Sequence, residues 1–142
     1  MDKNSFFWKM VGGELPTPAC AATLGIGFIR IDGERGIVEV SFEAKPEFLN
    51  PAGNVQGGFL AAMLDDTMGP ALTSTLDAGE FAPTLSLNVQ FHRPGKVGTL
   101  RGIGRVVTRG REICQLSGEL SQNDRIVATA TATAIIRKIQ ES

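Results

Sequence analysis

The sequence contains few of the residues on which most catalytic sites depend. It has one histidine, His92, and two cysteines, Cys20 and Cys114, in 142 residues. A single histidine excludes every site that needs two, and the distance between the cysteines matches no metal-binding spacing. The Gly-x-Ser-x-Gly turn of serine hydrolases and the Gly-Lys-Ser/Thr phosphate loop are also missing. We therefore expect no metal and no cofactor, two buried thiols rather than a disulfide, and a surface or loop-supporting histidine.

Long apolar runs and an excess of one charge are missing too. No stretch approaches the ~20 apolar residues of a membrane span. The 14 basic and 15 acidic side chains give a formal net charge of −1, which argues against nucleic acid or an anionic membrane as a partner. Lys9 and Glu14 interrupt the start of the chain, so it makes a poor secretory signal, and we expect a cytoplasmic protein.

Composition and periodicity predict one α+β domain. No repeat or charge block divides the chain, so we take 1–142 as a single domain, with an N-terminal extension at 1–18 and a core at 19–138. Helical periodicity predicts a short helix at 4–11 and a central helix at 59–73. Alternating apolar and polar residues, bounded by turns, predict strands at 24–31, 37–42, 83–91, 100–107, 112–120 and 126–136. The expected architecture is an antiparallel sheet of about six strands around one helix.

The predicted central helix has two contrasting faces. Its apolar face comprises Phe59, Leu60, Met63, Leu64, Met68 and Ala71. The opposite side carries what we call the small stripe, which consists of Gly58, Ala62, Asp65 and Gly69. A solvated face would normally carry long charged side chains, so we expect another element to pack closely on this stripe. Pro70 is expected to kink or end the helix, because proline removes a hydrogen bond and clashes with the preceding turn.

The start of this helix combines unpaired amides with a carboxylate. Gln56, Gly57 and Gly58 lie where backbone N–H groups lack intrahelical partners and attract negative charge. Asp65 follows two turns later, and we expect it within a few ångströms of these amides. Such a pair suits addition of water to a carbonyl, because the amides hold the oxyanion and the carboxylate activates the attacker. The alternative is that the glycines only cap the helix and that Asp65 and Asp66 are solvated.

The same residues resemble a known family. The run from Asn50 to Gly58, with Asp65 after it, is similar to the motif of hotdog-fold acyl-CoA thioesterases of the phenylacetate-degradation (PaaI-like) branch. The turn at 94–98 and the terminal Ala/Thr strand match as well, and the resemblance covers about residues 24–137. It implies a hotdog fold, in which the sheet wraps around the central helix.

The resemblance also implies roles for individual residues. The N–H of Gly57 would polarise the thioester carbonyl, and Asp65 would be the catalytic carboxylate, as general base or as nucleophile. Asn50 would help to place the attacking water or the carbonyl, and Thr84 would support the water. Gln56 stands where the family usually has a histidine that supports the loop, and an amide can also donate and accept there.

Two further expectations concern partners. In this family the site is built across two subunits, so the resemblance implies a homodimer, or a dimer of dimers that makes a homotetramer. An acyl-CoA substrate would lie against Gly58, and its phosphates would need cations. Candidates on turns are Arg93, Lys96, Arg109 and Arg111.

The sequence leaves three functions open. The first is hydrolysis of an acyl- or aroyl-CoA thioester without metal or redox cofactor. The second is a non-catalytic acyl-CoA binding module, which the glutamine at position 56 favours. The third is a hotdog dehydratase, which we rank lowest because no histidine accompanies the helix carboxylate. Phe6, Phe7, Trp8 and Phe59 would either line the acyl pocket or pack in the core.

Overall fold

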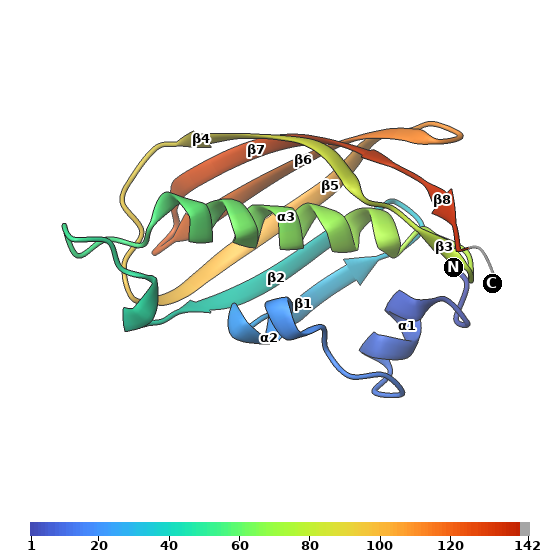
Figure 1. Ribbon diagram of the computed structural model, residues 1–142, viewed down its shortest axis with the longest axis horizontal. Helices are drawn as coiled ribbons and strands as arrows, with labels where there is room; N and C mark the ends of the chain where they lie inside the picture. Colours follow the sequence, from blue (N-terminus) through green and yellow to red (C-terminus); the bar gives the residue numbers. More distant parts are fainter. Residues whose placement is uncertain (140–142) are drawn as a thin grey trace.

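The computed structural model describes residues 1–139 and confirms the predicted α+β architecture. One helix, α3 (Gly57–Thr73), lies against a six-stranded antiparallel sheet that curves around it (Figure 1). The strands are β1 (Gly27–Asp32), β2 (Ile37–Ala44), β4 (Thr84–Phe91), β5 (Gly98–Arg109), β6 (Ile113–Gln122) and β7 (Arg125–Ile135). Their spatial order is β1-β2-β5-β6-β7-β4, so β1 and β4 form the two edges.

The helix approaches the sheet closely because the strands beneath it carry glycine. A Cβ atom on Gly102 or Gly104 of β5 would clash with Thr67 of α3, and one on Gly118 of β6 would lie 2.8 Å from Met68 Cγ. This contact buries the predicted apolar face of the helix, with Met68 fully inaccessible to solvent. Only Phe59 of that face stays partly exposed. Close packing of this kind leaves no room for added side-chain volume.

Strand β7 shows the predicted alternation most clearly. Its alanines point into the core and are at most 6% exposed, namely Ala128, Ala130, Ala132 and Ala134. The threonines between them lie on the other face, as the period of two requires. The strand pairs with β6 on one side and with β4 on the other.

The sequence predicts that Pro70 kinks or ends the helix, and the helix does not end there. It continues through Pro70 to Thr73. The missing proline N–H leaves the Asp66 carbonyl without its helical partner, but tertiary contacts hold the last turn. Leu72 is buried, and the carbonyl of Ser74 accepts a hydrogen bond from the Trp8 indole at 3.0 Å.

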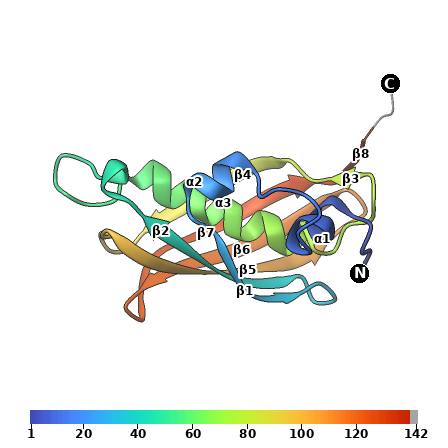
Figure 2. The same ribbon diagram turned by 90° about the horizontal axis from the view of Figure 1, so that it is seen from below.

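The N-terminal residues form helices along the flank of α3. Helix α1 (Phe6–Val11) begins at Ser5, whose hydroxyl accepts from Trp8 N, and lies within the predicted range 4–11. A second short helix, α2 (Ala19–Thr23), was not predicted, and Figure 2 shows both beside α3 and β1. Cys20 lies in α2 and is exposed, so the expectation that both thiols are buried is wrong for it, whereas Cys114 in β6 is buried. The sheet buries the Cys114 side chain in β6, whereas a five-residue helix on the surface is too small to bury the Cys20 side chain.

Three other small elements complete the chain. The 3₁₀ helix η1 (Pro46–Phe48) follows β2, and the two-residue strands β3 (Glu80–Phe81) and β8 (Arg137–Lys138) pair with each other. Such short segments carry too few residues for a periodic signal. None of the helices within residues 1–139 combines the length and the hydropathy that crossing a bilayer requires.

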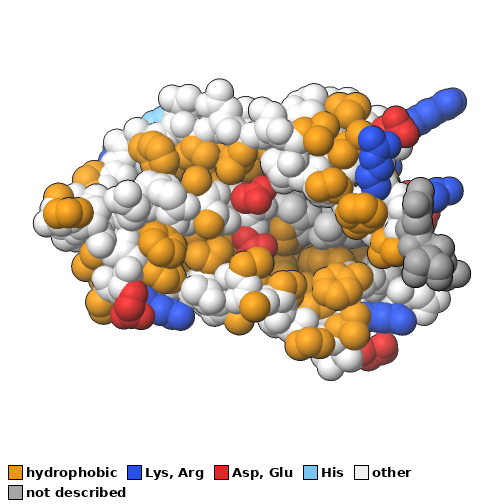
Figure 3. Space-filling model, viewed as in Figure 1, with side chains coloured by type: hydrophobic (Ala, Val, Ile, Leu, Met, Phe, Trp, Pro, Cys, Tyr) orange, Lys and Arg blue, Asp and Glu red, His pale blue; other side chains and the backbone are white. Residues whose placement is uncertain are grey.

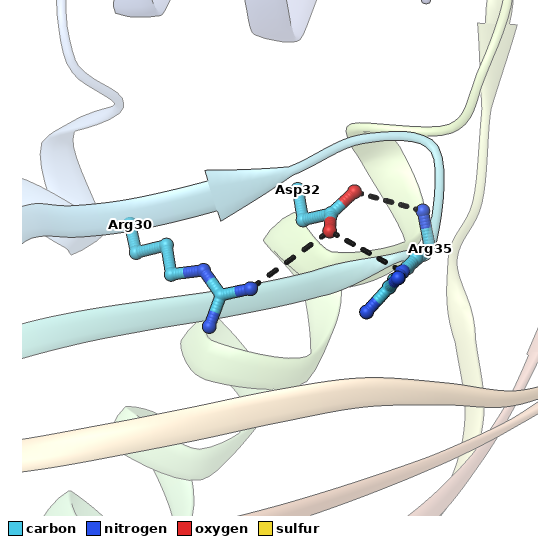
Figure 4. A network of polar contacts seen from close by, with 3 residues as sticks. All are labelled: Arg30, Asp32 and Arg35. Atoms are coloured by element: carbon cyan, nitrogen blue, oxygen red, sulfur yellow. Dashed lines mark hydrogen bonds and ion pairs between the residues drawn. The ribbon is translucent and has the colours of Figure 1, made fainter.

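The turn between β1 and β2 forms as its sequence predicts. The carboxylate of Asp32 accepts from Arg35 N at 3.1 Å and lies 3.9 Å from Arg30 Nη2 and 3.8 Å from Arg35 Nε (Figure 4). Gly36 closes the turn with φ +67°, a backbone conformation that favours glycine.

Candidate active site

The loop before α3 is held by its backbone and presents two free amides. Gln56 N donates to Phe48 O at 2.8 Å, and its carbonyl accepts from Phe59 N at 2.9 Å. Neither the Gly57 N–H nor the Gly58 N–H donates a hydrogen bond within the described part of the chain. The positive end of the helix dipole adds to these donors, so this end of α3 can bind an oxyanion.

We call the surroundings of these amides the amide half-site. A pocket of about 330 Å³ opens there, and Asn50, Gly57 and Arg93 line it together. The Asn50 side-chain oxygen accepts from Ala52 N at 3.0 Å and from Asn54 N at 3.1 Å. Since its oxygen is occupied in this way, Asn50 has its NH₂ group left to donate to a ligand.

Asp65 lies in a second group, which we call the carboxylate half-site. Thr84, the first residue of edge strand β4, donates its hydroxyl to Asp65 Oδ1 at 2.9 Å. Both residues face the side of α3 that the sheet does not cover. Because the Thr84 hydroxyl uses its only proton on Asp65, its oxygen remains free to accept a hydrogen bond from water.

The two half-sites are separate within one chain. Gly57 and Asp65 are eight residues apart on one continuous helix, which corresponds to a rise of about 12 Å at ~1.5 Å per residue. The expectation that they lie a few ångströms apart is therefore wrong for a single chain. The two half-sites can act together only if a second chain supplies one of them.

Asp66 differs from its neighbour in burial. Its Oδ2 is inaccessible to solvent and has no hydrogen-bond partner among the residues described. Burial, with a smaller contribution from the charge of Asp65, raises the pKa of Asp66 from 3.8 to about 6. The alternative that both aspartates are solvated therefore does not hold for Asp66.

The four candidate phosphate-binding cations divide into two groups. Arg93 and Lys96 border one large surface depression, and Arg125 at the start of β7 borders it with them. We call these three the basic rim. Arg109 instead donates to Thr75 Oγ1 at 3.0 Å beyond the C-terminal end of α3, and Arg111 follows it, so one chain does not bring the four together. Arg125 was not among the candidates, because its turn lies beside Arg93 and Lys96 only through the pairing of β6 with β7.

Gln56 and His92 are both exposed. The Gln56 side chain makes no hydrogen bond within residues 1–139, so it does not support the loop in this chain. The exposed position of His92 confirms the expected surface role. Its Nε2 lies 2.8 Å from Thr129 Oγ1 of strand β7, and the residue also borders the amide half-site.

The arrangement agrees with a family comparison. The sequence model of the Thioesterase superfamily matches residues 52–133, a range that contains Gly57, Asp65 and Thr84. The chain belongs to the thioesterase superfamily. It is therefore a thioester hydrolase, and its fold is the expected hotdog fold.

Several solved structures are similar to this thioesterase in sequence and in fold. A phenylacetic acid degradation-related protein of Ralstonia eutropha JMP134 is 48% identical, with a TM-score of 0.90 over 92% of this chain and 99% of that one. The PaaI protein of the E. coli phenylacetic acid degradation operon is 25% identical, with a TM-score of 0.80 over 96% and 95%. A Streptococcus mutans UA159 protein bound to acetyl CoA is 28% identical, with a TM-score of 0.72 over 82% and 91%. Comparison with curated proteins gives no match.

Proposed function

We propose that this thioesterase hydrolyses acyl-CoA esters to the free acid and CoA, with Asp65 as the catalytic carboxylate. The observation that carries this proposal is the hydrogen bond from Thr84 to Asp65 on the uncovered side of α3. That contact orients a carboxylate and leaves an acceptor for water beside it. A similar protein that binds acetyl CoA supports the choice of substrate.

In the proposed reaction, Asp65 acts as general base or as nucleophile. As a base, it takes a proton from water while the water oxygen bonds to the thioester carbon. As a nucleophile, it forms an acyl-aspartyl anhydride, which water then hydrolyses. By either route the carbon–sulfur bond breaks, CoA leaves as a thiolate that takes up a proton, and the acyl group leaves as the acid. The Gly57 N–H and the Asn50 NH₂ would hold the oxyanion.

A second copy of the chain would complete the site. The partner subunit's Gly57 would meet Asp65 of the first chain, and the reverse contact would form the second site of a twofold dimer. The small stripe supports this arrangement, because nothing lies within 4 Å of a Cβ placed on Gly58 or Gly69. Edge strand β4 also exposes apolar side chains, with Leu85 58% and Phe91 56% accessible. A homodimer, or a dimer of dimers, would cover both surfaces.

The basic rim would bind the phosphates of CoA. Its depression adjoins the amide half-site, since Arg93 borders both. Arg93 Nη1 donates to Ile126 O at 2.8 Å, which fixes its guanidinium beside the turn that carries Arg125. A fixed guanidinium is a good phosphate ligand, because less of its rotamer freedom is lost on binding.

The first test measures free thiol released from a panel of CoA thioesters. Asp65→Asn keeps the shape of the side chain and removes its charge, so kcat should fall by ~10²–10⁴. Asp77→Asn, an exposed aspartate after α3, is the matched control and should behave as wild type. Thiol release by wild type but not by Asp65→Asn would support the proposal. Equal release by both would refute the role of Asp65.

The oxyanion role can be tested by removing one hydrogen. Gly57 is the first residue of α3, where proline is well tolerated, and the preceding Gln56 has a ψ of 136° that suits a residue before proline. Gly57→Pro should therefore fold, and kcat should fall by ~10²–10³ because the N–H is lost. Gly57→Ala keeps the N–H and should lose far less, since its Cβ would meet only the ring edge of Phe91 at 3.1 Å. Equal losses in both variants would contradict the assignment.

A further inference from the structure

Phe91, the last residue of β4, has an exposed aromatic ring at the amide half-site. It pairs with Ala128 of β7, whose side chain is buried in the core, so the ring lies on the face of the sheet that carries α3. The ring borders the same pocket as Asn50 and Gly57. Figure 3 shows hydrophobic side chains along the strip where β4 borders α3, with acidic side chains in the middle of the face. The proposed reaction gives this ring no role.

The edge of the Phe91 ring, and not its face, points at the start of α3. A Cβ atom placed on Gly57 would lie 3.1 Å from Phe91 Cζ, 3.4 Å from its Cε1 and 3.6 Å from its Cε2. These three atoms form the far edge of the ring. Because glycine has no Cβ, this edge reaches the backbone that carries the free Gly57 N–H.

The edge of an aromatic ring attracts negative charge. The π-electrons concentrate on the two faces of the ring, so the C–H groups at its edge are slightly positive. Contacts of such C–H groups with oxygen are weaker than those of an N–H donor. An oxyanion carries more negative charge than the carbonyl oxygen of the bound thioester, so a positive edge beside it stabilises the transition state more than the substrate.

We propose that the edge of Phe91 is a third component of the oxyanion site, beside the Gly57 N–H and the Asn50 NH₂, and stabilises the charge on the thioester oxygen during hydrolysis. This inference rests on the function proposed above and assigns no proton transfer or covalent step to Phe91. The alternative is that the ring only adds apolar surface to the contact with a second copy. Leu87 provides the matched control, because it lies on the same strand and the same face and pairs with the buried Ala132.

Steady-state turnover is the first test, with the CoA thioester that the panel shows to be hydrolysed fastest. Phe91→Leu keeps an apolar side chain and removes the aromatic edge, so kcat should fall about threefold to fivefold with little change in KM. Leu87→Ala removes apolar surface from the same face of β4 and should keep the wild-type kcat. A wild-type kcat in Phe91→Leu, or an equal loss in Leu87→Ala, would overturn the inference.

Binding of an inert ketone tests the contact without turnover. The probe is the analogue of acetyl-CoA in which a methylene group replaces the sulfur, with ¹³C at the carbonyl. Positive groups beside the oxygen polarise the carbonyl, so its ¹³C resonance should move downfield on binding to wild type and to Leu87→Ala, and less on binding to Phe91→Leu. Equal shifts in wild type and Phe91→Leu, or no shift in wild type, would overturn the inference. If wild type releases no thiol from any ester, the proposed function is wrong, and the carbonyl shift still decides whether Phe91 contacts the bound oxygen.

Discussion

Replacing Asp66 by asparagine should stabilise the folded protein, and more at high pH than at low pH. The pKa of this carboxyl is about 6 in the folded chain against a reference value of 3.8. At a pH well below 3.8 the group is protonated in both folded and unfolded chains and has no effect. As the pH rises through that value the unfolded chain loses its proton first, so the ionisation opposes folding, and the penalty is complete above pH 6. Asparagine cannot ionise and avoids it.

The size of the effect follows from the shift. A shift of about two pKa units corresponds to a penalty of about 3 kcal/mol. Asp66 is only partly buried, so screening by water should reduce the penalty to about 1–2 kcal/mol. The stability advantage of Asp66→Asn should therefore grow by about 1 kcal/mol between pH ~4.5 and pH ~8.

Urea unfolding of wild type and variant at the two pH values measures this difference. The protomer concentration must be the same throughout, because assembly would shift the midpoint. Asp77→Asn removes an exposed carboxylate and should show no stability advantage that grows with pH. If Asp66→Asn gains the same stability at both pH values, or loses stability near pH 8, the burial of Asp66 described above is wrong.

Three further predictions concern catalysis, binding and packing. Thr84→Val removes the hydrogen-bond donor to Asp65, so kcat should fall by about tenfold, or ~1.4 kcal/mol in the barrier, with KM nearly unchanged. Steady-state assays measure both constants, and a change in KM alone would contradict a role of this hydrogen bond in catalysis. Arg125→Ala should raise KM for acyl-CoA about tenfold. KM for an acyl-N-acetylcysteamine thioester, which lacks phosphates, should not change. Equal effects on both substrates would refute a phosphate-binding role for Arg125. Gly104→Ala should lower the free energy of unfolding by about 2–3 kcal/mol, because its Cβ meets the Thr67 carbonyl oxygen. Denaturant unfolding measures this loss, and a neutral result would contradict the close approach of helix and sheet.

Local patterns were sufficient for the main elements. The 3.6 period at 59–73 predicted both the helix and its buried face, and the alternation of alanine and threonine predicted β7 and which of its faces is buried. These patterns work because side-chain direction repeats with the backbone geometry of each element. The functional assignments of Gly57, Asp65 and Asn50 came from a motif resemblance, and their roles stay predictions.

Burial and neighbourhood could not be predicted in this way. Asp65 and Asp66 are adjacent and chemically identical, yet within the described residues only Asp66 has a buried side-chain oxygen without a partner, on the side of the helix where residues of α1 and β1 line a pocket with it. The Cys20 side chain was expected to be buried and is exposed. Its burial depends on how the short helix α2 packs against the rest of the chain, which local sequence does not reveal.

The sequence by itself determined that one amphipathic helix crosses an antiparallel sheet, and that its start carries free amides and its middle a carboxylate. Only the tertiary structure decided that Thr84 reaches Asp65, that Arg125 joins Arg93, and that a pocket opens beside Asp66. Periodicity depends on residues a few positions apart, whereas these contacts join segments that are distant in the sequence and meet only when the sheet closes around the helix.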